Sequence, residues 1–223
     1  TRVALVIPFV GIATYLVLSK RIRTVLIFGG ILVFMFAFFK YTNIGQGNSN
    51  IRRTRTAFNP SKDASYLVRL ENQNKMKTYM VDKPFGIGIG LSAGRAQKYG
   101  SYTKLSELPT DSWFVLVWIE TGIIGLSLYI GVLLFILAYS AYIIMFKLKN
   151  KELRQYMMGL YGGIAGMMVA AYANEAFTQF PNGFIVYIGL AMISISPYFD
   201  KGIEEKEQKE KEIVEGSKQF TAL

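Results

Sequence analysis

Three carboxylates stand where the neighbouring sequence is apolar or uncharged: Asp111, Glu120 and Glu175. Glu120 lies inside the apolar run that starts at Ser112, and ionisable residues in such runs are usually functional. The chain has no histidine and no cysteine, which excludes thiolate nucleophiles and zinc–thiolate sites. Any acid–base chemistry must therefore use Asp, Glu, Lys or Tyr.

Each of these carboxylates also has a purely structural explanation. Thr110 and Asp111 could cap the helix that follows them, because short polar side chains accept hydrogen bonds from first-turn N–H groups. Glu120 and Glu175 could line one cavity and orient a site there, or could be buried in ion pairs with basic residues. The sequence leaves both interpretations open.

Basic residues dominate the polar region 41–111. It carries eleven Lys or Arg residues against five Asp or Glu. The planar guanidinium of arginine binds phosphate oxygens with two parallel hydrogen bonds. A diphosphate is therefore a candidate ligand, and contact with anionic lipid headgroups or plain solvation is the alternative. The candidate arginines are Arg52, Arg53, Arg55, Arg69 and Arg95.

A glycine-rich turn, Pro-Phe-Gly-Ile-Gly-Ile-Gly, occupies residues 84–90. It is not a dinucleotide fingerprint, since the third glycine is misplaced and no strand–helix unit surrounds it. It could cradle a phosphate with backbone N–H groups. The favoured interpretation is a turn whose missing side chains let the backbone pass close to neighbouring helices.

Long apolar runs decide the fold class. The chain is 52% hydrophobic with a mean hydropathy of +0.29, and five apolar runs approach or exceed the length that crosses a bilayer core. We predict an all-α, polytopic transmembrane protein with a large, partly helical outer loop. The first residues lie at an apolar run that has neither the basic region nor the cleavage site of a signal peptide, so we expect further transmembrane helices upstream. The runs are Val3–Leu18, Thr24–Lys40, Ser112–Phe146, Tyr156–Ala176 and Gly183–Phe199.

The predicted organisation follows from these runs. Residues 1–40 form two transmembrane helices, 41–111 the outer loop, 112–199 three more transmembrane helices, and 200–223 a charged tail. Within the loop, about 62–81 reads as an amphipathic helix. The two short connections near residues 19–23 and 147–154 are basic, which places them and the tail in the cytoplasm.

Several motifs together resemble one protein family. They are Arg69, the segment Lys83–Gly88, the segment Pro109–Phe114 and the run Glu-Thr-Gly-Ile-Ile-Gly-Leu at 120–126. In this order and spacing they are similar to the C-terminal module of the O-antigen ligase and polymerase family. The members are polytopic proteins of the bacterial inner membrane.

The resemblance implies glycosyl transfer at the periplasmic face from an undecaprenyl-diphosphate-linked glycan. The acceptor would be the lipid A core or another glycan, with membrane lipids as surroundings. No metal, nucleotide sugar, other cofactor or nucleic-acid partner is expected. The family's loop arginines hold the diphosphate, and Arg69 matches one of them by its position ahead of the glycine turn.

One departure from the family pattern concerns the base. The ligases usually carry His-Asn where this chain has Thr110-Asp111, so Asp111, or less directly Glu120, would have to activate the acceptor hydroxyl. Polymerisation of repeat units by the same machinery is an alternative. In other classes, a transporter would use Glu120 and Glu175 on a solute path but should show internal repeats. A non-catalytic membrane scaffold would need no base.

Overall fold

The structure is a computed structural model that describes residues 6–19, 22–42, 47, 64–92, 96, 98, 105 and 107–221. The described residues form helices joined by turns, with no strand among them, which confirms the all-α class. The elements are α1 (Val6–Ser19), α2 (Ile22–Tyr41), α4 (Ala64–Met80), α6 (Trp113–Tyr142), the π-helical turn η3 (Ile143–Lys147), α7 (Lys151–Ala170), the 3₁₀ turn η4 (Ala176–Thr178) and α8 (Asn182–Thr221).

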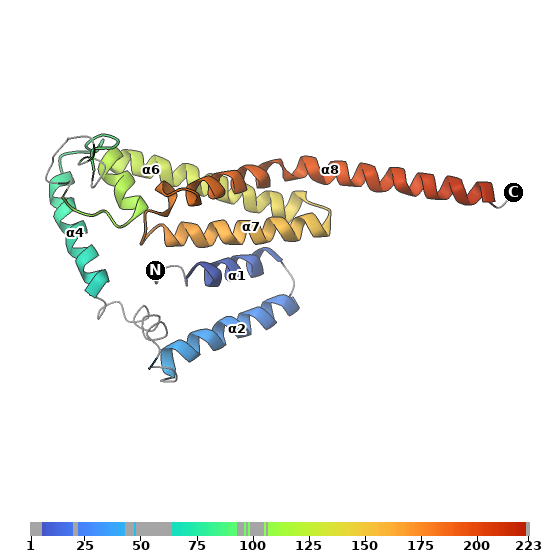
Figure 1. The fold of residues 1–223 in the computed structure, drawn as a ribbon, viewed down its shortest axis with the longest axis horizontal. Coiled ribbons are helices and arrows are strands. Elements are labelled where there is room, and N and C mark those ends of the chain that lie inside the picture. Colours follow the sequence, from blue (N-terminus) through green and yellow to red (C-terminus); the bar gives the residue numbers. More distant parts are fainter. Residues whose placement is uncertain are drawn as a thin grey trace.

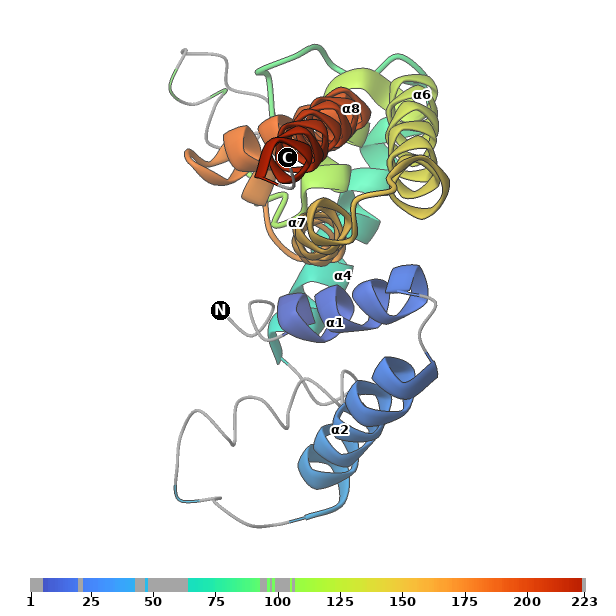
Figure 2. The same ribbon diagram turned by 90° about the vertical axis from the view of Figure 1, so that its right-hand side faces the viewer.

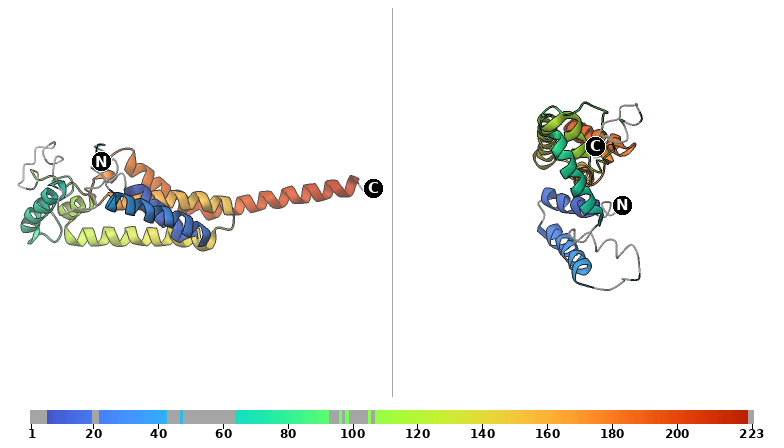
Figure 3. Two further views of the ribbon diagram at one scale, coloured as in Figure 1. Left: turned by 90° about the horizontal axis from the view of Figure 1, so that it is seen from below. Right: turned by 90° about the vertical axis from the view of Figure 1, so that its left-hand side faces the viewer.

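The core lies where α6, α7 and α8 run side by side (Figures 1 and 3). Leu133 and Ile144 meet Met157 and Ile164 of α7 and Leu190 of α8 in one buried apolar cluster. Figure 2 shows α1 beneath α7, with α2 farther out on the other side of α1. The three-helix core therefore holds the later half of the chain together.

Within the described residues, two segments are long and apolar enough to cross a membrane, Trp113–Lys147 and Asn182–Ile213. Large apolar side chains on both face outward, among them Leu128, Phe135 and Ile195. A soluble protein would bury such residues, whereas a lipid-facing helix exposes them. The remaining spans and the orientation stay predictions.

Glycines let α1 approach α7 closely. A Cβ on Gly162 would lie 2.7 Å from the carbonyl oxygen of Gly11, and one on Gly166 would lie 2.6 Å from that of Ile7. Gly162 and Gly166 are four residues apart, the spacing that brings small residues onto one helix face in membranes. The two backbones therefore touch without intervening side chains.

α8 is one continuous helix although Pro197 lies inside it. Proline has no N–H to donate to the carbonyl of Ile193, four residues earlier. The hydroxyl of Ser196 donates to that oxygen at 2.7 Å instead. The charged tail, which the sequence left as a helix or a disordered end, is therefore helical as far as Thr221 and projects beyond the core (Figure 1).

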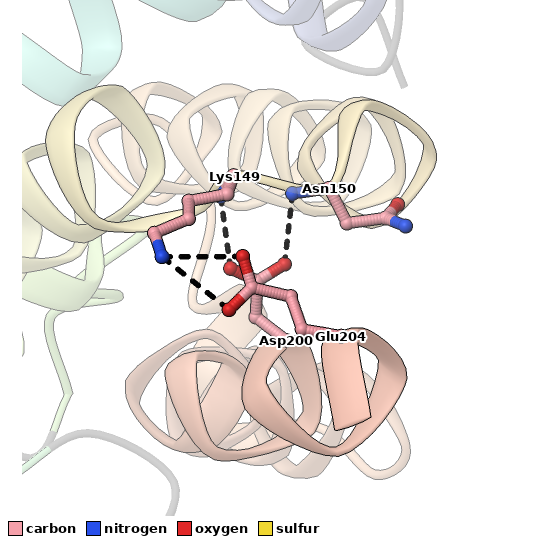
Figure 4. Close-up of polar contacts among 4 residues, drawn as sticks. All are labelled: Lys149, Asn150, Asp200 and Glu204. Carbon is pink, nitrogen blue, oxygen red and sulfur yellow. Dashed lines mark hydrogen bonds and ion pairs between the residues drawn. The ribbon is translucent and has the colours of Figure 1, made fainter. Parts of the chain in front are cut away.

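Asp200 fixes this helix to the connection between α6 and α7 (Figure 4). Its buried carboxylate accepts the backbone N–H groups of Lys149 at 2.8 Å and Asn150 at 2.9 Å. The Lys149 ammonium also lies 3.2 Å from Glu204. The Asn150 side chain caps α7 by accepting from the N–H groups of Glu152 and Leu153.

α4 stands at the opposite end of the core from the tail (Figure 1). It lies within the segment where a loop helix was predicted. Met76 and Met80 are buried against Ile119 of α6. In the N-terminal half of α4, the large apolar side chains Tyr66 and Leu70 are exposed. The buried side of α4 is therefore confined to its C-terminal half.

Candidate active site

α6 is broken at Gly122, where the backbone leaves the helical region with φ 72° and ψ −174°. That conformation is essentially restricted to glycine. The break frees backbone groups on both sides, because helical bonds join residues four apart. It divides α6 into a first arm, 113–121, and a second arm, 123–142.

The glycine turn at 84–90 supplies hydrogen-bond partners for the backbone groups that the break leaves unpaired. The N–H groups of Ile87 and Gly88 donate to the carbonyls of Ile119 and Glu120, at 2.9 and 3.0 Å. In the other direction, the N–H of Ile124 donates to the carbonyl of Pro84 at 3.3 Å. Three backbone hydrogen bonds thus join the turn to the broken helix.

The backbones at Gly86 and Gly122 lie close together where the glycine turn meets the break in α6, a contact that we call the junction. A Cβ on Gly122 would collide with the carbonyl oxygen of Pro84, and one on Gly86 would collide with that of Glu120. Gly86 also has a positive φ of 80°. The close approach predicted for the glycine turn is therefore present, and its partner is the break in α6.

Glu120 ends the first arm with its side chain buried, 6% exposed. The hydroxyl of Ser92, which is fully buried, donates to its Oε1 at 2.8 Å. Ser92 follows the glycine turn by two residues, and nothing in its local sequence distinguishes it. Sequence reasoning missed it because the partner lies 28 residues away.

The other end of the first arm gathers polar groups. The hydroxyl of Thr110 donates to Oε1 of Glu175. Asp111 is exposed and has a positive φ of 47°, a conformation that few side chains adopt and that often marks functional sites. The N-cap of α6 is Ser112 rather than Thr110 or Asp111, and its buried hydroxyl makes no capping bond.

Trp113 anchors this polar end. Its backbone N–H donates to the carbonyl of Ala171 at 3.0 Å, and its indole Nε1–H donates to the hydroxyl of Tyr129 at 2.8 Å. The indole also meets the ring of Phe177 edge to face, with centroids 6.0 Å apart. Three separate segments therefore fix the residue that follows Asp111 and Ser112.

The sequence of the chain matches a known family. A family model described as O-antigen ligase matches residues 1–130, more than half of the chain. The chain belongs to the O-antigen ligase family. Membership indicates a membrane-associated protein with glycosyltransferase-type activity. Comparison with curated proteins and with solved structures finds no match.

The part that matches the O-antigen ligase family contains Arg69, Asp111 and Glu120, whereas Glu175 lies beyond it. Arg69 is half-buried on α4. In the described part of the chain, no hydrogen bond or ion pair joins it to a candidate carboxylate. Of the other predicted diphosphate ligands, Arg52, Arg53, Arg55 and Arg95 lie outside the described residues.

The structure brings Glu175 to the Asp111 end but keeps Glu120 apart from it. Asp111 and Glu120 lie at opposite ends of the first arm, and the helical rise over those residues is about 13 Å. Asp111 and Glu120 therefore cannot contact one reacting atom together. The cavity predicted to be lined by both Glu120 and Glu175 stays a prediction. Among the described residues, no group of three acidic, His or Cys side chains could hold a metal.

Proposed function

We propose that this member of the O-antigen ligase family transfers a glycan from an undecaprenyl-diphosphate carrier to an acceptor hydroxyl at the periplasmic face of the inner membrane. Asp111 carries the proposal. It is an exposed carboxylate, held in an unusual backbone conformation at the outer end of a broken apolar helix. The Thr110–Glu175 hydrogen bond and the Trp113 anchor fix the backbone on both sides of it.

The chemistry assigned to Asp111 is general-base catalysis. Its carboxylate takes the proton of the acceptor hydroxyl as that oxygen bonds to the anomeric carbon of the donor. The bond from this carbon to the diphosphate breaks, and undecaprenyl diphosphate leaves with the electron pair. A positioned base of this kind contributes roughly 10²–10⁴ to the rate.

The leaving diphosphate needs positive charge. Arg69 supplies it in this proposal, with support from Arg52, Arg53, Arg55 and Arg95. Charge that develops on a leaving group is best stabilised by donors that are already in place, and arginine binds phosphate oxygens in pairs. Glu120, bonded to Ser92 at the junction with the glycine turn, keeps the first arm in position.

The test compares Asp111→Asn with Glu107→Gln, which neutralises a nearby exposed carboxylate. In a deletion strain complemented with each variant, Asp111→Asn should lose surface glycan by about 10²-fold or more, with normal membrane insertion. Glu107→Gln should complement fully. Full complementation by Asp111→Asn would refute the assignment. Accumulated carrier-linked chains in the deletion strain would indicate ligation, and single repeat units would indicate polymerisation.

A further inference from the structure

The glycine turn at 84–90 leaves two large apolar side chains exposed. Phe85 is 74% exposed and Ile89 is 81% exposed. Ile87, between them, packs instead against the buried cluster that contains Met76 and Ile119. The turn therefore has an inner apolar side, which belongs to the protein interior, and an outer apolar side, which needs a different partner.

The outer side of the turn continues the exposed apolar face of α6. The carbonyl of Pro84 accepts the N–H of Ile124 at 3.3 Å, so Phe85 directly follows a residue that is bonded to the second arm. At the start of that arm, Ile123, Ile124 and Leu128 are all exposed. Exposed apolar surface that extends over several elements marks contact with a membrane or a partner protein.

The length of the second arm sets the level of the turn relative to a bilayer. From Ile123 to Phe146 the chain carries no charged side chain, and Lys147 follows directly. A helix of that length rises by about 36 Å, and the hydrocarbon core is about 30 Å thick. The turn follows α4, which lies at the end of the core away from the tail (Figure 1). The break at Gly122 and the glycine turn therefore lie at the membrane boundary opposite Lys147.

The backbone of the turn suits an environment with little water. Unpaired backbone groups are costly in lipid, because no water is there to bond them. Pro84 has no N–H, and the segment from Pro84 to Ser92 carries no charged side chain. The N–H groups that donate to backbone carbonyls are those of Gly86, Ile87, Gly88 and Leu91. The turn can therefore enter the edge of the acyl region without carrying a charge or most of its N–H groups there unpaired.

We infer that the glycine turn is a membrane anchor, whose Phe85 and Ile89 insert among the acyl chains of the leaflet on the side away from the tail. The occupant of this surface is bulk phospholipid, and the exposed Asp82 and Lys83 stay at its headgroups. Amphipathic segments bury their apolar side by about 5–10 Å in this way. Because the turn is bonded to α6 on both sides of Gly122, the anchor holds the break at the membrane boundary. This inference does not depend on the proposed transfer reaction.

A nitroxide spin label can measure the depth of the turn. The chain has no cysteine, so Phe85→Cys and Ile89→Cys each create a single labelling site. The full chain is reconstituted in vesicles of phosphatidylethanolamine and phosphatidylglycerol that contain no polyprenyl lipid. Collisions of the label with oxygen, which concentrates in lipid, are compared with its collisions with a water-soluble nickel chelate. The ratio of oxygen to nickel collisions should be severalfold higher at both positions than for a label in water.

Two further labelled positions give the references. Leu128→Cys places the label on the lipid-facing side of the second arm, 70% exposed, and should give the highest ratio. Glu71→Cys places it on α4 at a charged, exposed position, and should give the lowest. Phe85→Cys and Ile89→Cys should fall between the two references, because the anchor enters only the edge of the acyl region. All four positions are exposed, so the labelled proteins should keep the Tm of the unlabelled chain.

A ratio at Phe85 and Ile89 equal to that at Glu71 would overturn the inference, because the turn would then lie in water. A ratio that rises only after undecaprenyl diphosphate is added would also overturn it, since the surface would then bind the chain of the carrier rather than phospholipid. Neither result depends on glycan transfer. Failure of the membrane anchor is therefore distinguishable from failure of the proposed function, which the surface-glycan assay of Asp111→Asn tests separately.

Discussion

Gly122→Ala tests the junction between the glycine turn and α6 most directly. The new methyl group would collide with the carbonyl oxygen of Pro84 and lie 2.5 Å from the backbone nitrogen of Gly86. Both neighbours are backbone atoms, so no side-chain rotation can make room. The turn must move away from the helix, and the three hydrogen bonds between them must lengthen or break.

The expected cost combines two contributions. A non-glycine residue held at this positive φ is strained by about 1–3 kcal/mol. Three backbone hydrogen bonds contribute roughly 1 kcal/mol each. The sum is about 4–6 kcal/mol, a large share of the stability of a typical domain. For a chain of this size it corresponds to a drop in Tm of roughly 10 °C or more.

Gly131→Ala is the matched control, since it makes the same change in the same helix. A Cβ at Gly131 meets nothing within 4 Å, and alanine in a helix interior gains about 0.5–1 kcal/mol over glycine. Thermal unfolding of both variants in the same detergent gives the comparison. If the Tm of Gly122→Ala equals that of the wild type or of Gly131→Ala, the close backbone contact between the glycine turn and α6 is refuted.

Three further substitutions test other contacts. Gly166→Leu should lower Tm by several degrees, because it forces α1 away from α7 at a cost of about 1–3 kcal/mol. Gly163→Leu should not, because a Cβ at Gly163 meets nothing within 4 Å. Asp200→Ala should destabilise by about 2–4 kcal/mol in chemical denaturation, since two backbone N–H groups lose a charged acceptor, while Glu204→Ala should cost at most about 1 kcal/mol. In the Trp118→Phe background, Tyr129→Phe removes the acceptor of the Trp113 indole and should shift its fluorescence emission; an unchanged spectrum would contradict that hydrogen bond.

Apolar runs and capping residues explain how much of the fold could be predicted. The run starting at Ser112 gave the position of α6, because apolarity over that length marks a lipid-facing helix. The fourth apolar run starts at Tyr156, whereas the helix that contains it, α7, starts at Lys151, directly after Asn150. Hydropathy marks the part of a helix that lies in lipid, whereas the cap marks where the helix begins.

The break at Gly122 could not be predicted, because the apolar pattern continues through it and glycine is tolerated in membrane helices. Its cause is a turn more than thirty residues earlier in the sequence. The pairing of Ser92 with Glu120 is hidden for the same reason. Asp111 could be singled out from its place before an apolar run. Its positive φ could not, and the residues on either side of it, Thr110 and Trp113, bond to Glu175 and Ala171, which lie far away in the sequence.

Because α8 is one continuous helix, its C-terminal part from Asp200 to Thr221 has a defined length. From Asp200 to Thr221 the helix rises by about 30 Å, comparable to the thickness of the bilayer core itself. With Pro197 bridged by Ser196 and Asp200 held by the α6–α7 connection, this segment acts as a stiff spacer rather than a tether. A fluorescent label attached near Thr221 would therefore lie at a defined distance from Asp200 and the α6–α7 connection. Energy transfer between labels at these two places could measure that distance.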